Sequence, residues 1–502
     1  MNNLSKIRLL PARCALDLGD GSERGEYVKQ GYILNSLGRL HRGINLMYCY
    51  YPYDRGWPER ASIAHARDDV SFAWDYPYDD YFPYQGGISG RAVHFTDEIR
   101  MWQQGITPSY QPFEQMQEIR RFGQDVILTL TIDPNVDDYH LRQIALELSC
   151  FGRLMLRINH EATGNWFAFN KRCTYQEVAD FFVHFHHIIK ERAPHIKTIL
   201  CIDGLENIEA TRIDREDEFA EAVRVADIWS IDKYLALHWG WPYSIAEPGG
   251  TSHKRSAVAD IYELTKKSYQ RFVEINNGVA KPMLMSEFNA DGDVTGAYEQ
   301  AEMVREFLTL RMEDPDDWLN GITFYQFRDR GRLGLEIEDP SDPDLGIAQP
   351  VMNIYKEFLR NPYFSPSFAD EGATLLPAKL RWGGSEDAEG VAINVLFAED
   401  PVFCEITFEE ELNLIIELNG RWFYKAPTAK TIDLMPAFYD NRLPQGGELS
   451  IRIFAPPADG MNPFEKKYRD EAFPANADWL VNTYTLLTKM PTLRLRYRPA
   501  SE

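Results

Sequence analysis

The feature that most constrains how this chain can fold is a regular alternation of short apolar runs with segments of helical periodicity, through roughly its first 360 residues. Such an alternation is typical of repeated β-α units, whose strands form a parallel sheet. Eight such units fit a closed (β/α)8 barrel, the TIM barrel, better than an open sheet. The predicted strands are residues 13–18, 44–50, 126–131, 153–158, 198–202, 227–231, 283–286 and 322–326. The predicted helices include residues 112–121, 174–192, 256–274, 297–311 and 350–359.

The pattern changes after Pro362. Short runs follow in which β-branched and polar residues alternate, interrupted by Gly and Pro, which is typical of an all-β sandwich. These runs are residues 391–397, 402–408, 412–418 and 449–454. A chain of 502 residues is also too long for one ordinary hydrophobic core. We therefore expect two domains, a (β/α)8 barrel over residues 1–362 and a β-sandwich accessory domain over residues 363–502.

Charge and composition argue against several classes of partner. The formal net charge of −23 argues against nucleic acid, whose phosphates require a basic surface. The sequence has no stretch of ~20 apolar residues, so we expect no membrane span. The first ten residues lack the apolar core and cleavage site of a signal peptide, which predicts a cytoplasmic protein. Formation of a homo-oligomer is left open.

Neither a metal ion nor a cofactor is expected. The six cysteines are scattered without a CxxC pair, which argues against a zinc site or a disulfide framework. His184, His186 and His187 fall on different faces of a predicted helix, and no HExxH motif accompanies them. The predicted site therefore consists of ordinary side chains.

Two carboxylic acids follow two different predicted strands. Glu161 lies in the segment Arg-Ile-Asn-His-Glu-Ala-Thr-Gly-Asn-Trp-Phe, residues 157–167, directly after an apolar run. Glu287 lies in Lys-Pro-Met-Leu-Met-Ser-Glu-Phe-Asn, residues 281–289. The loops after the strands of a (β/α)8 barrel meet at one face, so we expect the two side chains to approach each other. Glycoside hydrolysis requires such a pair, because one carboxyl protonates the leaving oxygen and the other attacks the anomeric carbon or activates water.

The motifs around these acids resemble those of glycoside hydrolase clan A, and most closely those of family 26. The resemblance covers residues 35–330 approximately and rests on the order of several motifs. They are Gly38-Arg39, residues 44–50, Trp57, Asp138-Tyr139, residues 157–167, Ser230-Ile-Asp-Lys-Tyr234 and residues 282–288. The resemblance implies a retaining hydrolase of β-linked oligo- or polysaccharide, of the mannan or glucan type.

The resemblance also implies roles for individual residues. Glu161 matches the general acid/base of the family and Glu287 its nucleophile. His160 matches the histidine beside the acid/base, Trp166 the aromatic residue that flanks it, and Tyr234 the tyrosine close to the nucleophile. The alternative is structural: the two acids would cap helices or form salt bridges, and His160 would only pack.

Four further residues are candidates for substrate binding. Arg157 is a plausible hydrogen-bond donor to the nucleophile, although a purely structural role is nearly as plausible. Asp232 belongs to the motif that contains Tyr234. Trp239 could stack on a sugar ring or fill its loop. Tyr325 stands at the end of the eighth predicted strand, where the clan places a Trp beneath the reacting sugar.

The chain departs from the family pattern around the substrate. Ala162-Thr163 stands where the family has Met-Asn, and Asn289 where it has Gly. Residues 203–207, Asp-Gly-Leu-Glu-Asn, replace a segment that contains Trp. These departures leave the catalytic pair in place and put the identity of the sugar in doubt.

The long segment between Tyr51 and Ser109 is rich in aromatic residues and Asp. Long loops of compact domains are usually functional or disordered. Aromatic rings and carboxylates together favour a sugar-binding wall, and the alternatives are an aromatic mini-core or an oligomer contact.

The sequence therefore predicts a retaining β-glycosidase that acts by double displacement on a carbohydrate substrate without a cofactor. The rival hypothesis is a non-catalytic carbohydrate-binding or scaffold protein on the same barrel. For the C-terminal domain, packing against the barrel is the expected role and carbohydrate binding the alternative.

Overall fold

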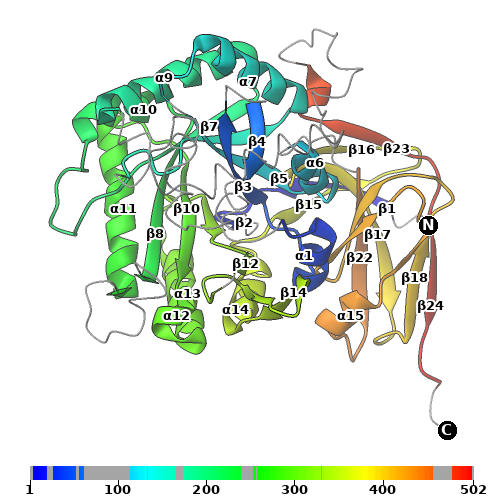
Figure 1. The fold of residues 1–502 in the computed structure, drawn as a ribbon. Helices are drawn as coiled ribbons and strands as arrows, with labels where there is room; N and C mark the ends of the chain where they lie inside the picture. Colours follow the sequence, from blue (N-terminus) through cyan, green and yellow to red (C-terminus); the bar gives the residue numbers. More distant parts are fainter. Residues whose placement is uncertain are drawn as a thin grey trace.

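A computed structural model describes residues 4–19, 27–51, 56–60, 113–132, 134–164, 173–238, 253–255, 257–329, 331–455 and 477–499. Two units lie side by side in it (Figure 1). One is a strand barrel surrounded by helices, and the other is built from antiparallel sheets.

Eight parallel strands form a closed barrel. Each strand pairs in parallel with its neighbours in one continuous sheet, and the first and the eighth strand of that sheet also pair with each other. The strands are β2 (Ala15–Gly19), β3 (Gly43–Tyr51), β5 (Asp125–Thr131), β6 (Leu154–Ile158), β7 (Ile196–Cys201), β8 (Ile228–His238), β10 (Met283–Ala290) and β11 (Gly321–Phe324). All eight predicted strands are confirmed. The largest difference is at β8, which continues seven residues beyond the predicted end at residue 231, since 238 − 231 = 7.

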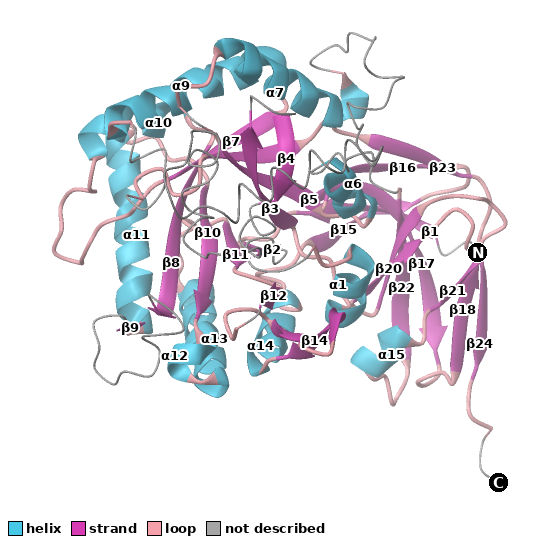
Figure 2. Ribbon diagram, in the orientation of Figure 1, coloured by secondary structure: helices cyan, strands magenta, loops and turns pink. Residues whose placement is uncertain are grey.

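Helices surround the barrel and cover the outer face of its strands (Figure 2). They are α1 (Gln30–Leu37), α6 (Phe113–Arg121), α7 (Asp138–Phe151), α9 (Tyr175–Arg192), α10 (Glu216–Val225), α11 (Val258–Ile275), α12 (Gly292–Thr295), α13 (Ala297–Glu313) and α14 (Pro350–Leu359). Local signals set the starts of two of them. Thr174 and Glu177 form a capping box at the start of α9, and Pro350 occupies the first turn of α14.

Burial on both faces explains why the barrel strands are almost continuously apolar. Every residue of β5 and of β10 is buried, the inner face against the barrel interior and the outer face against helices. A strand with one wet face would instead alternate between apolar and polar residues.

The C-terminal part is all-β, as predicted. An eight-stranded antiparallel sheet contains the path β15-β1-β17-β22-β19-β20 together with β16 and β23, and a second sheet has the order β21-β18-β24. The strands are β1 (Leu4–Leu10), β15 (Ser367–Ala373), β16 (Ala378–Gly384), β17 (Asp387–Phe397), β18 (Phe403–Thr407), β19 (Leu414–Leu418), β20 (Arg421–Lys425), β21 (Thr431–Asp433), β22 (Gly447–Phe454), β23 (Thr483–Leu487) and β24 (Thr492–Arg496). The helices α15 (Pro436–Asp440) and η1 (Asp478–Leu480) accompany them.

The first strand of the chain corrects one part of the predicted division. The sequence assigned residues 1–362 to the barrel, but β1 pairs with β15 and β17 of the C-terminal sheet (Figure 1). The side chains of Leu4, Ile7 and Leu9 are buried in the core of that sheet, and a register shift between Lys6 and Ile7 interrupts the alternation. Pairing between strands that lie far apart in the sequence leaves no local signal, which is why the sequence did not reveal it. The boundary at residue 362 itself stays a prediction.

Short strands extend the barrel. β4 (Gly56–Arg60) runs antiparallel to β3, and β9 (His253–Arg255) runs antiparallel to β8. After β11, the strands β12 (Arg328–Asp329), β13 (Glu336–Asp339) and β14 (Asp342–Ala348) form a small sheet. Most of the aromatic segment predicted as a sugar-binding wall lies outside the described residues. None of the described helices combines the length and the apolar character needed to cross a membrane.

The C-terminal unit contacts the barrel at the amino ends of its strands. Arg153, just before β6, donates a hydrogen bond to the carbonyl oxygen of Gly383. Ser385 Oγ donates to the carbonyl oxygen of Arg42, which precedes β3, at 2.9 Å. Because these contacts lie at the amino ends, the carboxyl ends of the same strands lie at the opposite end of the barrel.

Candidate active site at the carboxyl ends of the strands

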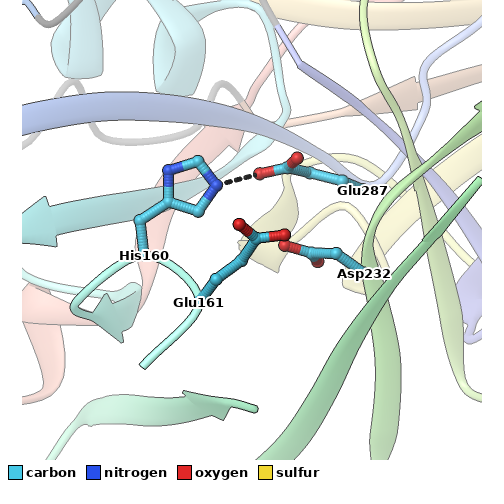
Figure 3. A group of neighbouring side chains, drawn as sticks. All are labelled: His160, Glu161, Asp232 and Glu287. Carbon is cyan, nitrogen blue, oxygen red and sulfur yellow. Dashed lines mark ion pairs between the residues drawn. The ribbon is translucent and has the colours of Figure 1, made fainter. Parts of the chain in front are cut away.

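The predicted site residues come together at the carboxyl ends of the barrel strands. His160 and Glu161 follow β6, Asp232 lies in β8, and Glu287 lies in β10 (Figure 3). One oxygen from each of the three carboxyl groups and one ring nitrogen of His160 all lie within 4.8 Å of one another. We call these four residues the carboxylate cluster.

Arg157 connects the cluster to the interior of the barrel. Its guanidinium is fully buried, and Nη1 donates to Glu287 Oε1 at 2.9 Å. Nη2 donates to Asp232 Oδ2 and to Cys201 Sγ, the latter at 3.2 Å. A buried charge is tolerated only with such partners. Arg157 is therefore placed beside the predicted nucleophile, as the sequence suggested.

Glu287 is surrounded by hydrogen-bond donors. Besides Arg157, His160 Nε2 lies 2.6 Å from Glu287 Oε1, and Tyr234 Oη donates to Oε2 at 2.9 Å. Burial by itself would raise the pKa of Glu287, but His160 and Arg157 outweigh it and hold that pKa at about 2. The carboxylate is therefore ionised at any ordinary pH, which is the state that a nucleophile requires.

The pKa of Glu161 is shifted in the opposite direction. Burial raises the pKa of Glu161 well above its ordinary value, and the charges of Asp232 and Glu287 raise it further. Figure 3 shows its carboxyl group between His160 and Asp232. The protonated form of Glu161 is therefore stabilised relative to an ordinary glutamic acid, which is the form that can donate a proton.

The loop that presents Glu161 is held in an unusual conformation. Asn159 and Glu161 both have positive φ, of 57° and 44°, which is uncommon for residues other than glycine. Asn159 Oδ1 accepts from the backbone of Ile132 at 2.8 Å, and the Ala162 amide donates to the carbonyl oxygen of Cys201 at 2.9 Å. Contacts to the two neighbouring strands thus offset the cost of this turn.

Burial also changes the other two members of the cluster. Burial lowers the pKa of His160, so the neutral ring donates from Nε2 to Glu287. Burial raises the pKa of Asp232 to about 7, because the charge of Arg157 only partly compensates for it and for the charge of Glu287. Around neutral pH the cluster therefore holds fewer negative charges than its three carboxyl groups suggest.

Several buried polar atoms of the site lack a hydrogen-bond partner among the described residues. They are Tyr325 Oη, Asp232 Oδ1 and Asn159 Nδ2. The ring of Tyr325 stands edge-on to Tyr234, with the centroids 6.0 Å apart, and packs with Met47. Buried polar groups in proteins are nearly always paired, so these atoms are available for a ligand.

By distance alone, the carboxylate cluster could hold a metal ion. However, the Arg157 guanidinium already donates to Glu287 and Asp232, and its fixed positive charge would repel a divalent cation. The donor set therefore fits an organic ligand better than a metal.

Most of the predicted site residues lie close together. The structure brings together Arg157, His160, Glu161, Asp232, Tyr234 and Glu287, with Tyr325 against Tyr234. Trp166 and Trp239 lie outside the described residues. The sequence analysis did not single out Asn159 and Cys201. Their position directly after or at the end of a barrel strand is the signal that could have indicated them.

Comparison with known proteins gives similarity at the level of structure alone. No protein-family model and no curated protein sequence matches the chain. A Cellulomonas fimi endo-β-1,4-mannanase variant aligns over 87% of this chain and 88% of its own, with 12% identity and a TM-score of 0.40. A family 51 α-L-arabinofuranosidase from Bifidobacterium longum aligns over 90% and 100%, with 10% identity and a TM-score of 0.42. A family 39 glycoside hydrolase from Bacteroides cellulosilyticus aligns over 88% and 80%, with 11% identity and a TM-score of 0.40. Similarity at this level does not identify a substrate or a mechanism.

Proposed function

We propose that this protein is a retaining glycoside hydrolase, with Glu161 as general acid/base and Glu287 as nucleophile. The observation that carries the proposal is a pair of neighbouring carboxyl groups whose pKa values are shifted in opposite directions. One oxygen of Glu161 lies within 4.8 Å of one oxygen of Glu287. Retaining enzymes have carboxyl groups about 5–5.5 Å apart, whereas inverting enzymes need about 6.5–9.5 Å to admit a water molecule.

The proposed reaction has two displacements. Glu287 attacks the anomeric carbon while Glu161 donates its proton to the glycosidic oxygen, so that the bond to the leaving group breaks and a glycosyl ester forms. Glu161, now ionised, then takes a proton from water, whose oxygen attacks the same carbon and releases Glu287. Neither step requires a cofactor.

The neighbours of the two acids have defined tasks in this scheme. Arg157, His160 and Tyr234 orient Glu287 and keep it ionised. Asp232 and Tyr325 offer their unpartnered oxygens to hydroxyl groups of the sugar in the site. Trp166 keeps its proposed place as the aromatic residue that flanks the acid/base, and Trp239 its proposed role of stacking on a sugar ring.

For the substrate we propose a β-linked oligo- or polysaccharide of the mannan or glucan type, in line with the family resemblance of the motifs. The second candidate function is non-catalytic carbohydrate binding on the same barrel. The opposite pKa shifts of Glu161 and Glu287 favour catalysis, because sugar binding alone does not require them. The cytoplasmic location and the open question of a homo-oligomer remain at the level of prediction.

Sugar release from β-mannan, mixed-linkage glucan, xylan and β-galactoside oligomers tests the proposal, with the anomeric configuration of the product followed by NMR. We expect cleavage with retention by the parent protein and none by Glu287→Ala. Adding azide to Glu287→Ala with an activated aryl glycoside should yield a glycosyl azide of inverted configuration. Glu302→Ala is the matched control, because Glu302 is 72% exposed on α13. Binding without cleavage by the parent across all substrates would favour the second function.

A further inference from the structure

Asp203 is an exposed carboxylate at the edge of the site. It follows β7 by two residues, at the carboxyl end of the barrel. Its position is set by Thr163, which lies two residues after Glu161. Thr163 Oγ1 donates to Asp203 Oδ2 at 3.0 Å, and the Asp203 amide donates back to Thr163 Oγ1 at 2.9 Å. Thr163 is itself 6% exposed, so the pair is anchored and does not move freely in solvent.

The loop of Glu161 and the segment of Asp203 are joined a second time. The amide of Ala162 donates to the carbonyl oxygen of Cys201 at 2.9 Å, and the amide of Gly164 closes the turn onto the carbonyl oxygen of Glu161 at 2.7 Å. Two tethers therefore hold the Asp203 carboxylate at a defined place relative to the carboxyl group of Glu161. The charge of Asp203 is close enough to contribute, after the buried neighbours, to the raised pKa of Glu161.

The two sides of Glu161 differ in what they can contact. On the inner side lie the buried Glu287 and the side chain of Asp232, which is 3% exposed, and these would surround the sugar that is attacked. Asp203 is exposed and so lies on the outer side. In the proposed reaction the acid protonates the bond that joins the attacked sugar to its leaving group. The leaving group therefore extends outward past Glu161, toward Asp203.

We propose that Asp203 recognises the leaving-group sugar: its Oδ1 accepts a hydrogen bond from one hydroxyl of that sugar, and its negative charge excludes a uronic acid from that position. Thr163 occupies Oδ2, and no other described residue is seen to bind Oδ1. A charged acceptor that is already held in place loses little entropy on binding, which makes it an effective recognition group. This inference rests on the proposed glycosidase function.

A role in recognition must be separated from a role in positioning Glu161. Asp203→Asn keeps an oxygen that can accept from Thr163 and removes the charge. The substrates are disaccharides that share the attacked sugar, each lacking a different hydroxyl of the leaving-group sugar. For the parent, we expect the loss of one particular hydroxyl to lower kcat/KM about tenfold, as for one hydrogen bond to a charged group. Asp203→Asn should lower kcat/KM for the full substrate by about the same factor. For that deoxy substrate, kcat/KM of Asp203→Asn should stay within about twofold of the parent's value.

A second arm tests the charge. A disaccharide with a uronic acid as leaving group should be a poor substrate of the parent and improve relative to the neutral one in Asp203→Asn. If Asp203→Asn lowered kcat/KM equally for the full substrate and for every deoxy substrate, and also shifted the pH profile, Asp203 would only position Glu161. That result would overturn the inference. A variant identical to the parent would overturn it as well. If the parent cleaves no glycoside at all, the proposed function fails, and the inference falls with it.

Discussion

Arginines pair with carboxylates at both ends of this barrel, and the two sites differ in how many carboxylate oxygens have a hydrogen-bond partner. At the amino ends, Arg42 donates to both oxygens of Asp17, through Nε at 3.0 Å and through Nη2. Asp125 Oδ2 there accepts from Arg153 at 2.8 Å and from Ser385 at 3.2 Å. At the carboxyl ends, Arg157 engages only one oxygen of each of its two carboxylates, and Asp232 Oδ1 is left without a described partner.

The comparison shows what distinguishes a structural ion cluster from a reactive one. Burial raises the pKa of Asp17 as it raises that of Asp232, so a shifted pKa by itself does not indicate catalysis. The two clusters differ instead in their hydrogen-bond partners, because Arg42 bonds both oxygens of Asp17, whereas Asp232 Oδ1 has no described partner. We propose that a ligand supplies the missing partner in the carboxyl-terminal cluster.

The largest expected effect concerns the nucleophile. Glu287→Gln should lower kcat on the order of 10⁴-fold, because the covalent step is lost while the shape of the site is kept. Its melting temperature should fall, because Arg157 and His160 lose a charged partner, so turnover is compared on protein shown to be folded. Steady-state kinetics on a cleaved oligosaccharide and thermal unfolding are the two measurements. Substantial residual turnover in a folded variant would remove Glu287 from the mechanism.

At the opposite end of the barrel, Asp17→Ala should affect folding and spare catalysis. It leaves the charge of Arg42 buried without its main partner, which should cost about 3–5 kcal/mol of unfolding free energy. Urea unfolding followed by tryptophan fluorescence measures this loss. The folded fraction should retain the parental kcat, and a selective loss of kcat in the folded protein would break the distinction between the two clusters.

A smaller effect is expected from a single hydroxyl. Tyr325→Phe should lower kcat/KM about tenfold, since it removes a buried hydroxyl that we propose bonds the sugar and that makes no hydrogen bond to a described residue. Tyr355→Phe is a matched control: its hydroxyl is also buried without a described partner, but it lies on α14, outside the site. Equal activity of the two variants would mean that Tyr325 does not touch the substrate.

The smallest effect is a displacement of the pH profile. The proposed mechanism requires Glu287 ionised and Glu161 protonated, so kcat/KM should decline as pH rises through the raised pKa of Glu161. Burial contributes most to that rise, and Asp232 adds to it. Asp232→Asn should therefore lower the pKa of Glu161 and move the alkaline limb to lower pH. An alkaline limb at higher pH in Asp232→Asn than in the parent would contradict the prediction that the charge of Asp232 raises the pKa of Glu161.

The sequence predicted the barrel strands well because their signal is local. Strands such as β5 are buried on both faces and read as continuous apolar runs wherever they occur. The signal fails where pairing is between distant segments. Neither the place of β1 in the C-terminal sheet nor the extension of β8, where β9 pairs with its last residues, could be read from neighbouring residues.

For the site, the sequence indicated which residues meet but not how each is ionised. Glu161 and Glu287 are the same residue type, each directly past or near the end of a barrel strand, and their sequence surroundings do not assign a pKa to either. Arg157 reaches Glu287 across 130 residues of chain. Periodicity and motif order therefore determined the barrel and the candidate acids. Only the tertiary structure decided in which direction each pKa is shifted, because a pKa depends on burial and on charges that the fold brings together from β6, β8 and β10.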